Sequence, residues 1–312
     1  MKGAGWLRAL LTVAILVYLA TRIDMREAGA ALLQLDPGAA LLVLLLLVID
    51  RAVMIWRWIL LLRSSETGIS NQSAAWIYLV SSFVGSFLPA GVGADVLRAY
   101  TLGQRTSDNS EAFASVAVDR VLGMLSIVLL GTAGVALWAR RANPELWESA
   151  LVLGILAAGF AAGLFWADRV LRVVLPDPWH ESSHARRVLR LADAVARYRG
   201  RSGTLASVMT LSIAVQVLRV LQAYVLGRGI GIEVGFVYYL VFMPVGLLML
   251  LLPISISGFG LPQGVIVWML RPQGVSDPQS FALSTLIVLL GLLGNLPGAW
   301  LYLRLARRQR ES

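Results

Sequence analysis

Several uninterrupted apolar stretches constrain this chain more than any other feature. The stretches 37–62, 111–138 and 204–226 each exceed the roughly 20 residues that an α-helix needs to cross the hydrocarbon core of a bilayer. Of the 312 residues, 58% are hydrophobic and 14% are charged, whereas soluble domains carry about 25% charged residues. The sequence therefore predicts an all-α, multi-pass membrane protein that forms a single transmembrane domain over 1–312.

Six apolar segments are predicted to cross the membrane. They are 6–20, 37–62, 111–138, 145–166, 204–226 and 278–303. The first segment, with Lys2 before it, also resembles a signal peptide, but no small-residue cleavage site follows it. We therefore count it as a crossing helix.

Two further apolar segments, 71–105 and 234–270, are interrupted by prolines and glycines, which end helices. Each remaining piece is too short to cross a bilayer. Each segment therefore predicts a re-entrant hairpin, which enters the membrane and returns on the same side. The breaks are expected at Pro89, Gly91, Gly93, Pro253, Gly258 and Gly260.

The distribution of arginine predicts the orientation. The hydrophilic loop 168–201 holds eight of the 27 basic residues, and four more lie at 304–310. Six crossings and two hairpins that do not cross put both segments, and both termini, in the cytoplasm, as the positive-inside rule requires. A basic amphipathic helix at 186–199 either lies on anionic phospholipid or is a solvated linker. Cytoplasmic segments and anionic lipid thus account for the net charge of +9. The sequence therefore predicts no nucleic-acid partner.

The order of segments predicts an inverted repeat, with one unit at about 37–138 and a second at about 204–303. Each unit has a crossing helix, a hairpin and another crossing helix, and the two hairpins enter from opposite sides. Phe87-Leu88-Pro89 with its following glycines is echoed by Leu251-Leu252-Pro253. Interrupted segments at corresponding positions of two halves indicate the central site of a transporter.

Charged residues inside the apolar segments are the candidate site, because each costs about 2.5–3.5 kcal/mol to insert. Asp50 belongs to this set, and Arg57 is expected to extend to the membrane interface. The helices that start after Gly93 and Gly260 are expected to direct their positive ends into a polar cavity that suits a lipid phosphate. The predicted substrate-binding residues are Arg51, Asp95, Arg98, Asp119, Arg120 and Arg219.

Catalytic and metal-binding patterns are weak. The chain has no cysteine, and the pair His180 and His184 lacks a third ligand. No phosphate-binding glycine loop is present. The sequence therefore predicts a protein without a metal or cofactor that is not an enzyme.

Residues 71–123, with Ser86-Phe87-Leu88-Pro89-Ala90-Gly91-Val92-Gly93 and Val118-Asp119-Arg120, resemble the flippase-like family named for the transmembrane region of lysylphosphatidylglycerol synthase. Leu252-Pro253-Ile254-Ser255-Ile256-Ser257-Gly258-Phe259-Gly260 is similar to the family's second motif. The resemblance implies a bacterial inner-membrane protein that moves a polar-headed lipid between leaflets. Asp119 stands where the family usually has a glutamate. Gln263 replaces a second family glutamate, which puts a proton- or cation-binding role of the second hairpin in doubt. The synthases add a transferase domain, whereas this sequence ends at Ser312, so synthase activity is not implied.

The leading hypothesis is transport of a phosphate-bearing lipid, such as aminoacyl-phosphatidylglycerol, another phospholipid or a polyprenyl phosphate. Arg98, Arg120 and Arg51 would pair with the phosphate. Two alternatives are a secondary transporter of a small anion and a membrane-embedded glycosyl- or phosphotransferase that uses Asp95 and Asp119. The sequence leaves the headgroup, the energy source, the direction and any homo-oligomer open.

Overall fold

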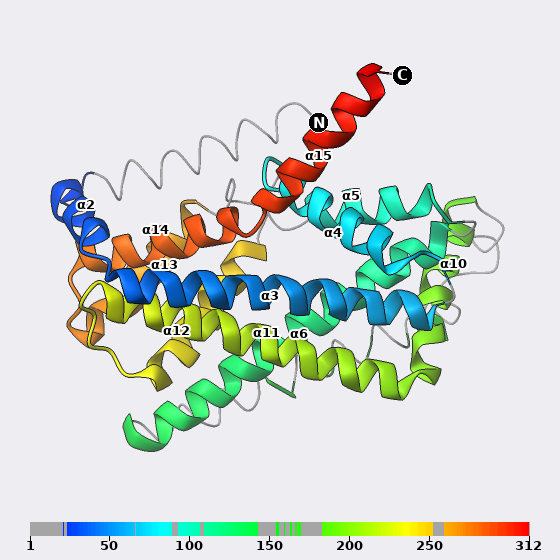
Figure 1. Ribbon diagram of the computed structural model, residues 1–312. Helices are drawn as coiled ribbons and strands as arrows, with labels where there is room; N and C mark the ends of the chain where they lie inside the picture. Colours follow the sequence, from blue (N-terminus) through cyan, green and yellow to red (C-terminus); the bar gives the residue numbers. More distant parts are fainter. Residues whose placement is uncertain are drawn as a thin grey trace.

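A computed structural model describes residues 21, 24–65, 67–88, 93–106, 109–142, 154–155, 159, 163, 166, 168–169, 183–251 and 259–311. The regular elements in these residues are all helices, without a β-strand (Figure 1). This confirms the predicted all-α class.

Four helices in the described residues are long and apolar enough to cross a membrane. They span Pro37–Ser64 (α3), Asn109–Ala139 within α6 (Asn109–Ala142), Ser202–Gly229 (α11) and Asp277–Arg304. They coincide with four of the six predicted crossings. Of the other two, 6–20 lies outside the described residues, and so does most of 145–166.

The last of these crossings is not the single helix that was expected over 278–303. It divides into α14 (Asp277–Leu293) and α15 (Leu296–Glu311). At the division the Asn295 amide donates to the Leu292 carbonyl at 3.0 Å instead of continuing the α-helical pattern. The physical reason is Pro297, which has no N–H to donate and disfavours helical backbone before it.

The two predicted hairpins are present as two pairs of short helices. α4 (Asn71–Gly85) packs on α5 (Gly93–Gly103), and α12 (Phe236–Leu251) packs on α13 (Leu261–Leu270). With a rise of about 1.5 Å per residue, none of the four covers the ~30 Å hydrocarbon core alone.

Two of the six predicted break residues lie in the described part of the chain. Gly93 begins α5, and Gly260 precedes α13 with φ of 103°, a backbone conformation that favours glycine. The other four, Pro89, Gly91, Pro253 and Gly258, lie outside the described residues.

The long helices bring the two predicted repeat units together. α3 runs across the molecule with α11 at its side, and α6 packs on α12 (Figure 1). α15 reaches back to α4, where a Cβ on Gly298 would lie 2.1 Å from the Leu79 carbonyl oxygen. The absence of a side chain on Gly298 therefore lets these two helices touch through their backbones.

The predicted amphipathic helix in the basic loop is α10 (Ser183–Arg197), which lies at the opposite end of the molecule from α2 (Met25–Leu33) (Figure 1). Ala194, Val195 and the adjacent Tyr198 are buried against the bundle. Arg197 forms an ion pair with Glu111 at the start of α6. Burial also raises the pKa of Tyr198 to about 12. One face of α10 is thus docked on protein.

Candidate functional site

A cavity of about 400 Å³ lies among α3, α4, α5, α6, α11, α12 and α14. Its lining joins residues that are far apart in the sequence, from Leu47 to Asn295. The charged residues of the described lining are five arginines and three aspartates. All six predicted substrate-binding residues are among them: Arg51, Asp95, Arg98, Asp119, Arg120 and Arg219.

Three of these charges form a buried group, the Asp119 cluster, made of Asp119, Arg57 and Arg98. The Asp119 carboxylate pairs with Nε of Arg57 at 2.8 Å and with Nη2 of Arg98 at 3.0 Å. All three residues are at most 5% exposed. The Arg98 guanidinium also lies over the rings of Trp58 and Tyr78, with its Cζ 4.9 and 5.1 Å from their centroids. The cluster therefore ties α3, α5 and α6 together.

The position of Arg57 corrects the expectation that it reaches the membrane interface. Its Nη1 donates to Ser212 Oγ of α11 at 3.0 Å, while Nε faces Asp119. A carboxylate and a hydroxyl inside the bundle satisfy the guanidinium better than a route to the surface. Sequence position near the end of an apolar segment gave no hint of these partners on other helices.

Asp95 and Arg120 form a more accessible pair beside the Asp119 cluster. Arg120 Nη1 lies 3.3 Å from one carboxylate oxygen of Asp95, and Arg98 Nη2 lies 3.2 Å from the other. The adjacent residues Asp119 and Arg120 thus contact different partners, as their helical spacing predicts. Asp95 stands in the first turn of α5, so the start of this helix lies at the cavity.

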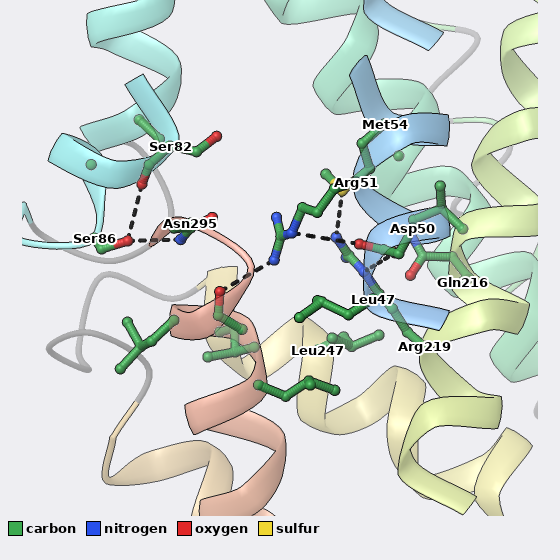
Figure 2. A pocket seen from close by; sticks show the side chains of 18 of the residues that line it. Leu47, Asp50, Arg51, Met54, Ser82, Ser86, Gln216, Arg219, Leu247 and Asn295 are labelled. Carbon is green, nitrogen blue, oxygen red and sulfur yellow. Dashed lines mark hydrogen bonds and ion pairs between the residues drawn. The ribbon is translucent and has the colours of Figure 1, made fainter. Parts of the chain in front are cut away.

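A second group, the Asp50 cluster, consists of Asp50, Arg51 and Arg219 (Figure 2). Arg219 Nε lies 3.3 Å from one Asp50 oxygen, and Arg51 Nε lies 3.8 Å from the other. Arg51 Nη2 also donates to the Gly291 carbonyl at 3.2 Å. That carbonyl is available because the Asn295 amide turns to Leu292. The division of the last crossing therefore provides an acceptor for Arg51.

Asn295 is a cavity residue that the sequence analysis missed. Its Nδ2 donates to Ser86 Oγ at 2.8 Å and so links the turn between α14 and α15 to the end of α4 (Figure 2). The run Gly294-Asn295-Leu296-Pro297 carried the necessary signal, because an asparagine and a proline inside an apolar crossing mark a break.

The second predicted helix end does not line the cavity. The Gly260 amide donates to Gln263 Oε1 at 3.1 Å, and Gln263 Nε2 donates to Thr285 Oγ1 at 3.0 Å. Gln263 is fully buried and satisfies the start of α13 within the protein. Two helix ends were expected to meet at one polar cavity. The end after Gly93 lies at the cavity, and the end after Gly260 does not.

Within the described residues, no three His, Cys, Asp or Glu side chains are grouped as metal ligands. The side chains of His180 and His184 lie outside the described part of the chain.

The fold and the cavity define a multi-pass α-helical membrane protein with a charged interior site. The sequence model of the family described as the lysylphosphatidylglycerol synthase transmembrane region matches residues 5–298, and the chain belongs to this family. A search of curated proteins finds no match.

Proposed function

We propose that this protein moves a phosphate-bearing polar lipid between the two leaflets of the bacterial inner membrane, with both termini in the cytoplasm. The headgroup passes through the charged cavity, while the hydrocarbon chains stay in the bilayer. The family description supports a role in lipid handling, since it names the membrane part of a lipid synthase.

The observation that carries the proposal is the surplus of arginine inside the cavity. Five arginines face three aspartates there, and charges at membrane depth are retained where they serve a substrate path. Guanidinium groups bind phosphate with several hydrogen bonds. A cavity of about 400 Å³ has the volume of a site for a small molecule or a headgroup.

The same contacts disfavour a membrane-embedded transferase. Such an enzyme would use Asp95 and Asp119 as its paired carboxylates. Asp119 is held between two buried arginines, and both Asp95 oxygens face arginines. Both carboxylates are thus engaged by arginine side chains, so we propose transport without catalysis.

The test is reconstitution into vesicles with headgroup-labelled lipids, followed by measurement of how fast the label changes leaflet. We expect exchange in the wild type, a loss of at least tenfold in Arg120→Ala, and wild-type rates in Arg63→Ala, whose arginine bonds to Asn71 at the surface. Equal rates for wild type, Arg120→Ala and empty vesicles would refute the proposal. Saturable uptake of a water-soluble anion, without lipid exchange, would favour a small-anion transporter.

A further inference from the structure

We infer that the cargo of this cavity is a lipid whose phosphate headgroup carries two negative charges. This inference rests on the proposed function, since it specifies the headgroup of the transported lipid. A phosphate monoester and a diphosphate both meet the description, whereas a phosphodiester carries one charge. An aminoacyl-phosphatidylglycerol adds a cationic amine to its single phosphodiester charge.

The described lining of the cavity carries more positive than negative charge. Five arginines and three aspartates leave two positive charges on the cavity lining. The Asp50 cluster contributes one of them, with two arginines around one carboxylate. The Asp119 cluster has the same ratio. Because charges in a low-dielectric interior need compensation, the described lining suits a bound group with two negative charges.

The arginines of the cavity fall into two groups, those that hold the helices together and those that face the cavity. The side chains of Arg57 and Arg98 are 6% and 5% exposed, and both bind Asp119. The side chains of Arg51, Arg219 and Arg120 are 19%, 25% and 35% exposed. The second group can therefore reach a bound headgroup without breaking the Asp119 cluster.

The two surplus positive charges lie on two different groups of cavity residues. One falls on the Asp50 cluster, where Arg51 is 3.8 Å from the carboxylate and uses a backbone carbonyl as a second acceptor. The other falls on the group of Arg57, Arg98 and Arg120, which share the two carboxylates of Asp95 and Asp119, and Arg120 has the most exposed side chain of the three. A doubly charged headgroup that meets Arg51, Arg219 and Arg120 neutralises both.

A singly charged phosphodiester would balance only one of the two surplus positive charges. The headgroup of lysyl-phosphatidylglycerol carries two amines, the α-amine and the side-chain amine of lysine. Both would bring positive charge toward three guanidinium groups. Like charges at such distances repel. The cavity of this chain is therefore matched to an anionic lipid and selects against a cationic one.

The experiment compares lipids with identical acyl chains on the purified full-length protein in detergent, by competition in native mass spectrometry. The series is dioleoyl phosphatidic acid, phosphatidylglycerol and phosphatidylcholine at pH 8, above the second pKa of a phosphate monoester at about 6. We expect phosphatidic acid to bind at least tenfold more tightly than phosphatidylglycerol, and phosphatidylcholine most weakly. Equal affinities for the first two lipids would overturn the inference.

Variants locate the preference. Arg51→Gln and Arg219→Gln are each expected to weaken phosphatidic acid binding about tenfold or more, since each removes a charge-assisted hydrogen-bond donor. Arg63→Gln, a loss of the same charge on the same helix outside the cavity, is the matched control and should bind like the wild type. Asp50→Asn removes the carboxylate that competes with phosphate, and it should bind phosphatidic acid more tightly. Weaker binding by Asp50→Asn, in a sample that keeps the wild-type thermal midpoint, would contradict the inference.

The outcome is distinguishable from that of the proposed function. Leaflet exchange without preference for phosphatidic acid would refute the doubly charged cargo and leave lipid transport standing. Inorganic pyrophosphate is the soluble arm of the test. Suppose that pyrophosphate competes as well as phosphatidic acid and that no lipid changes leaflet. The preference for two negative charges would then be supported, and the claim that a lipid carries them would be refuted.

Discussion

At the scale of single residues, Asp119 is the carboxylate on which the charged interior depends. It neutralises two buried arginines from two other helices. Sequence analysis identified Asp119, Arg98 and Arg120 as candidates, because a charge within an apolar segment is visible in the sequence. It could not identify the partner of each charge, since pairing depends on how the helices pack. Arg57 is the example, for its partners Asp119 and Ser212 come from helices far along the chain.

Asp119→Asn should destabilise the protein by about 3–5 kcal/mol, because it leaves two buried guanidinium groups without their shared counter-ion. The measurement is unfolding of the purified protein in detergent, by heat or by a denaturing detergent. Asp277→Asn is the control, since Asp277 pairs with the exposed Arg271 at 2.6 Å and such pairs contribute about 1 kcal/mol or less. Similar effects of the two substitutions would show that the Asp119 cluster does not hold the helices.

Gln263 presents a second prediction at this scale. Gln263→Leu keeps the volume but removes the acceptor for the Gly260 amide and the donor to Thr285. A buried donor left without a partner costs about 1–3 kcal/mol, so we expect a loss of stability of that size with lipid exchange retained. Gln279→Ala near the exposed start of α14 serves as the control. A loss of exchange at unchanged stability would instead give Gln263 a part in transport.

At the scale of elements, the lengths of apolar segments predicted the long helices and both pairs of short ones. The division between α14 and α15 was not predicted, although Pro297 was visible. One proline in an apolar run is compatible with a kinked, continuous helix. Two tertiary contacts act together with Pro297 to fix the turn: Arg51 donates to the Gly291 carbonyl, and Asn295 donates to Ser86.

The contact between α15 and α4 can be tested at Gly298. In Gly298→Ala the new Cβ would lie 2.1 Å from the Leu79 carbonyl oxygen, a backbone atom that cannot move alone. We expect a loss of about 1–3 kcal/mol from this overpacking, measured as a lower midpoint of unfolding. In Gly264→Ala of α13 the Cβ meets nothing within 4 Å, so that variant should be neutral or slightly more stable. Equal midpoints for the two variants would argue against a backbone contact between α15 and α4.

At the scale of the whole molecule, the sidedness that the arginines indicate stays a prediction. α10 lies at one end of the bundle, and the loop between α13 and α14 lies toward the end that carries α2 (Figure 1). The prediction puts α10 in the cytoplasm and that loop outside. The inverted repeat stays a prediction. Similar helices in the two units do not determine whether the units have opposite orientations in the membrane.

The sidedness can be tested with single cysteines, because the natural sequence has none. We expect Gln273→Cys to react with a membrane-impermeant maleimide on intact spheroplasts. Gly200→Cys, at a position where a Cβ meets nothing within 4 Å, should react only after the membrane is opened. Labelling of Gly200→Cys from outside would reverse the orientation and place the basic loop on the wrong side.

The buried Asp119 cluster also has a consequence for the order in which the protein is made. α3 emerges from the ribosome with Asp50, Arg51 and Arg57, each costing about 2.5–3.5 kcal/mol in lipid, before the segment with Asp119 has been synthesised. Its run of six leucines and one valine at 41–47 offsets part of that cost by about 0.3–0.6 kcal/mol per residue. The part that belongs to Arg57 is recovered when α6 arrives with Asp119, and the part that belongs to Asp50 is recovered when α11 arrives with Arg219. We therefore expect α3 to stay beside the insertion machinery until these later helices supply its counter-ions.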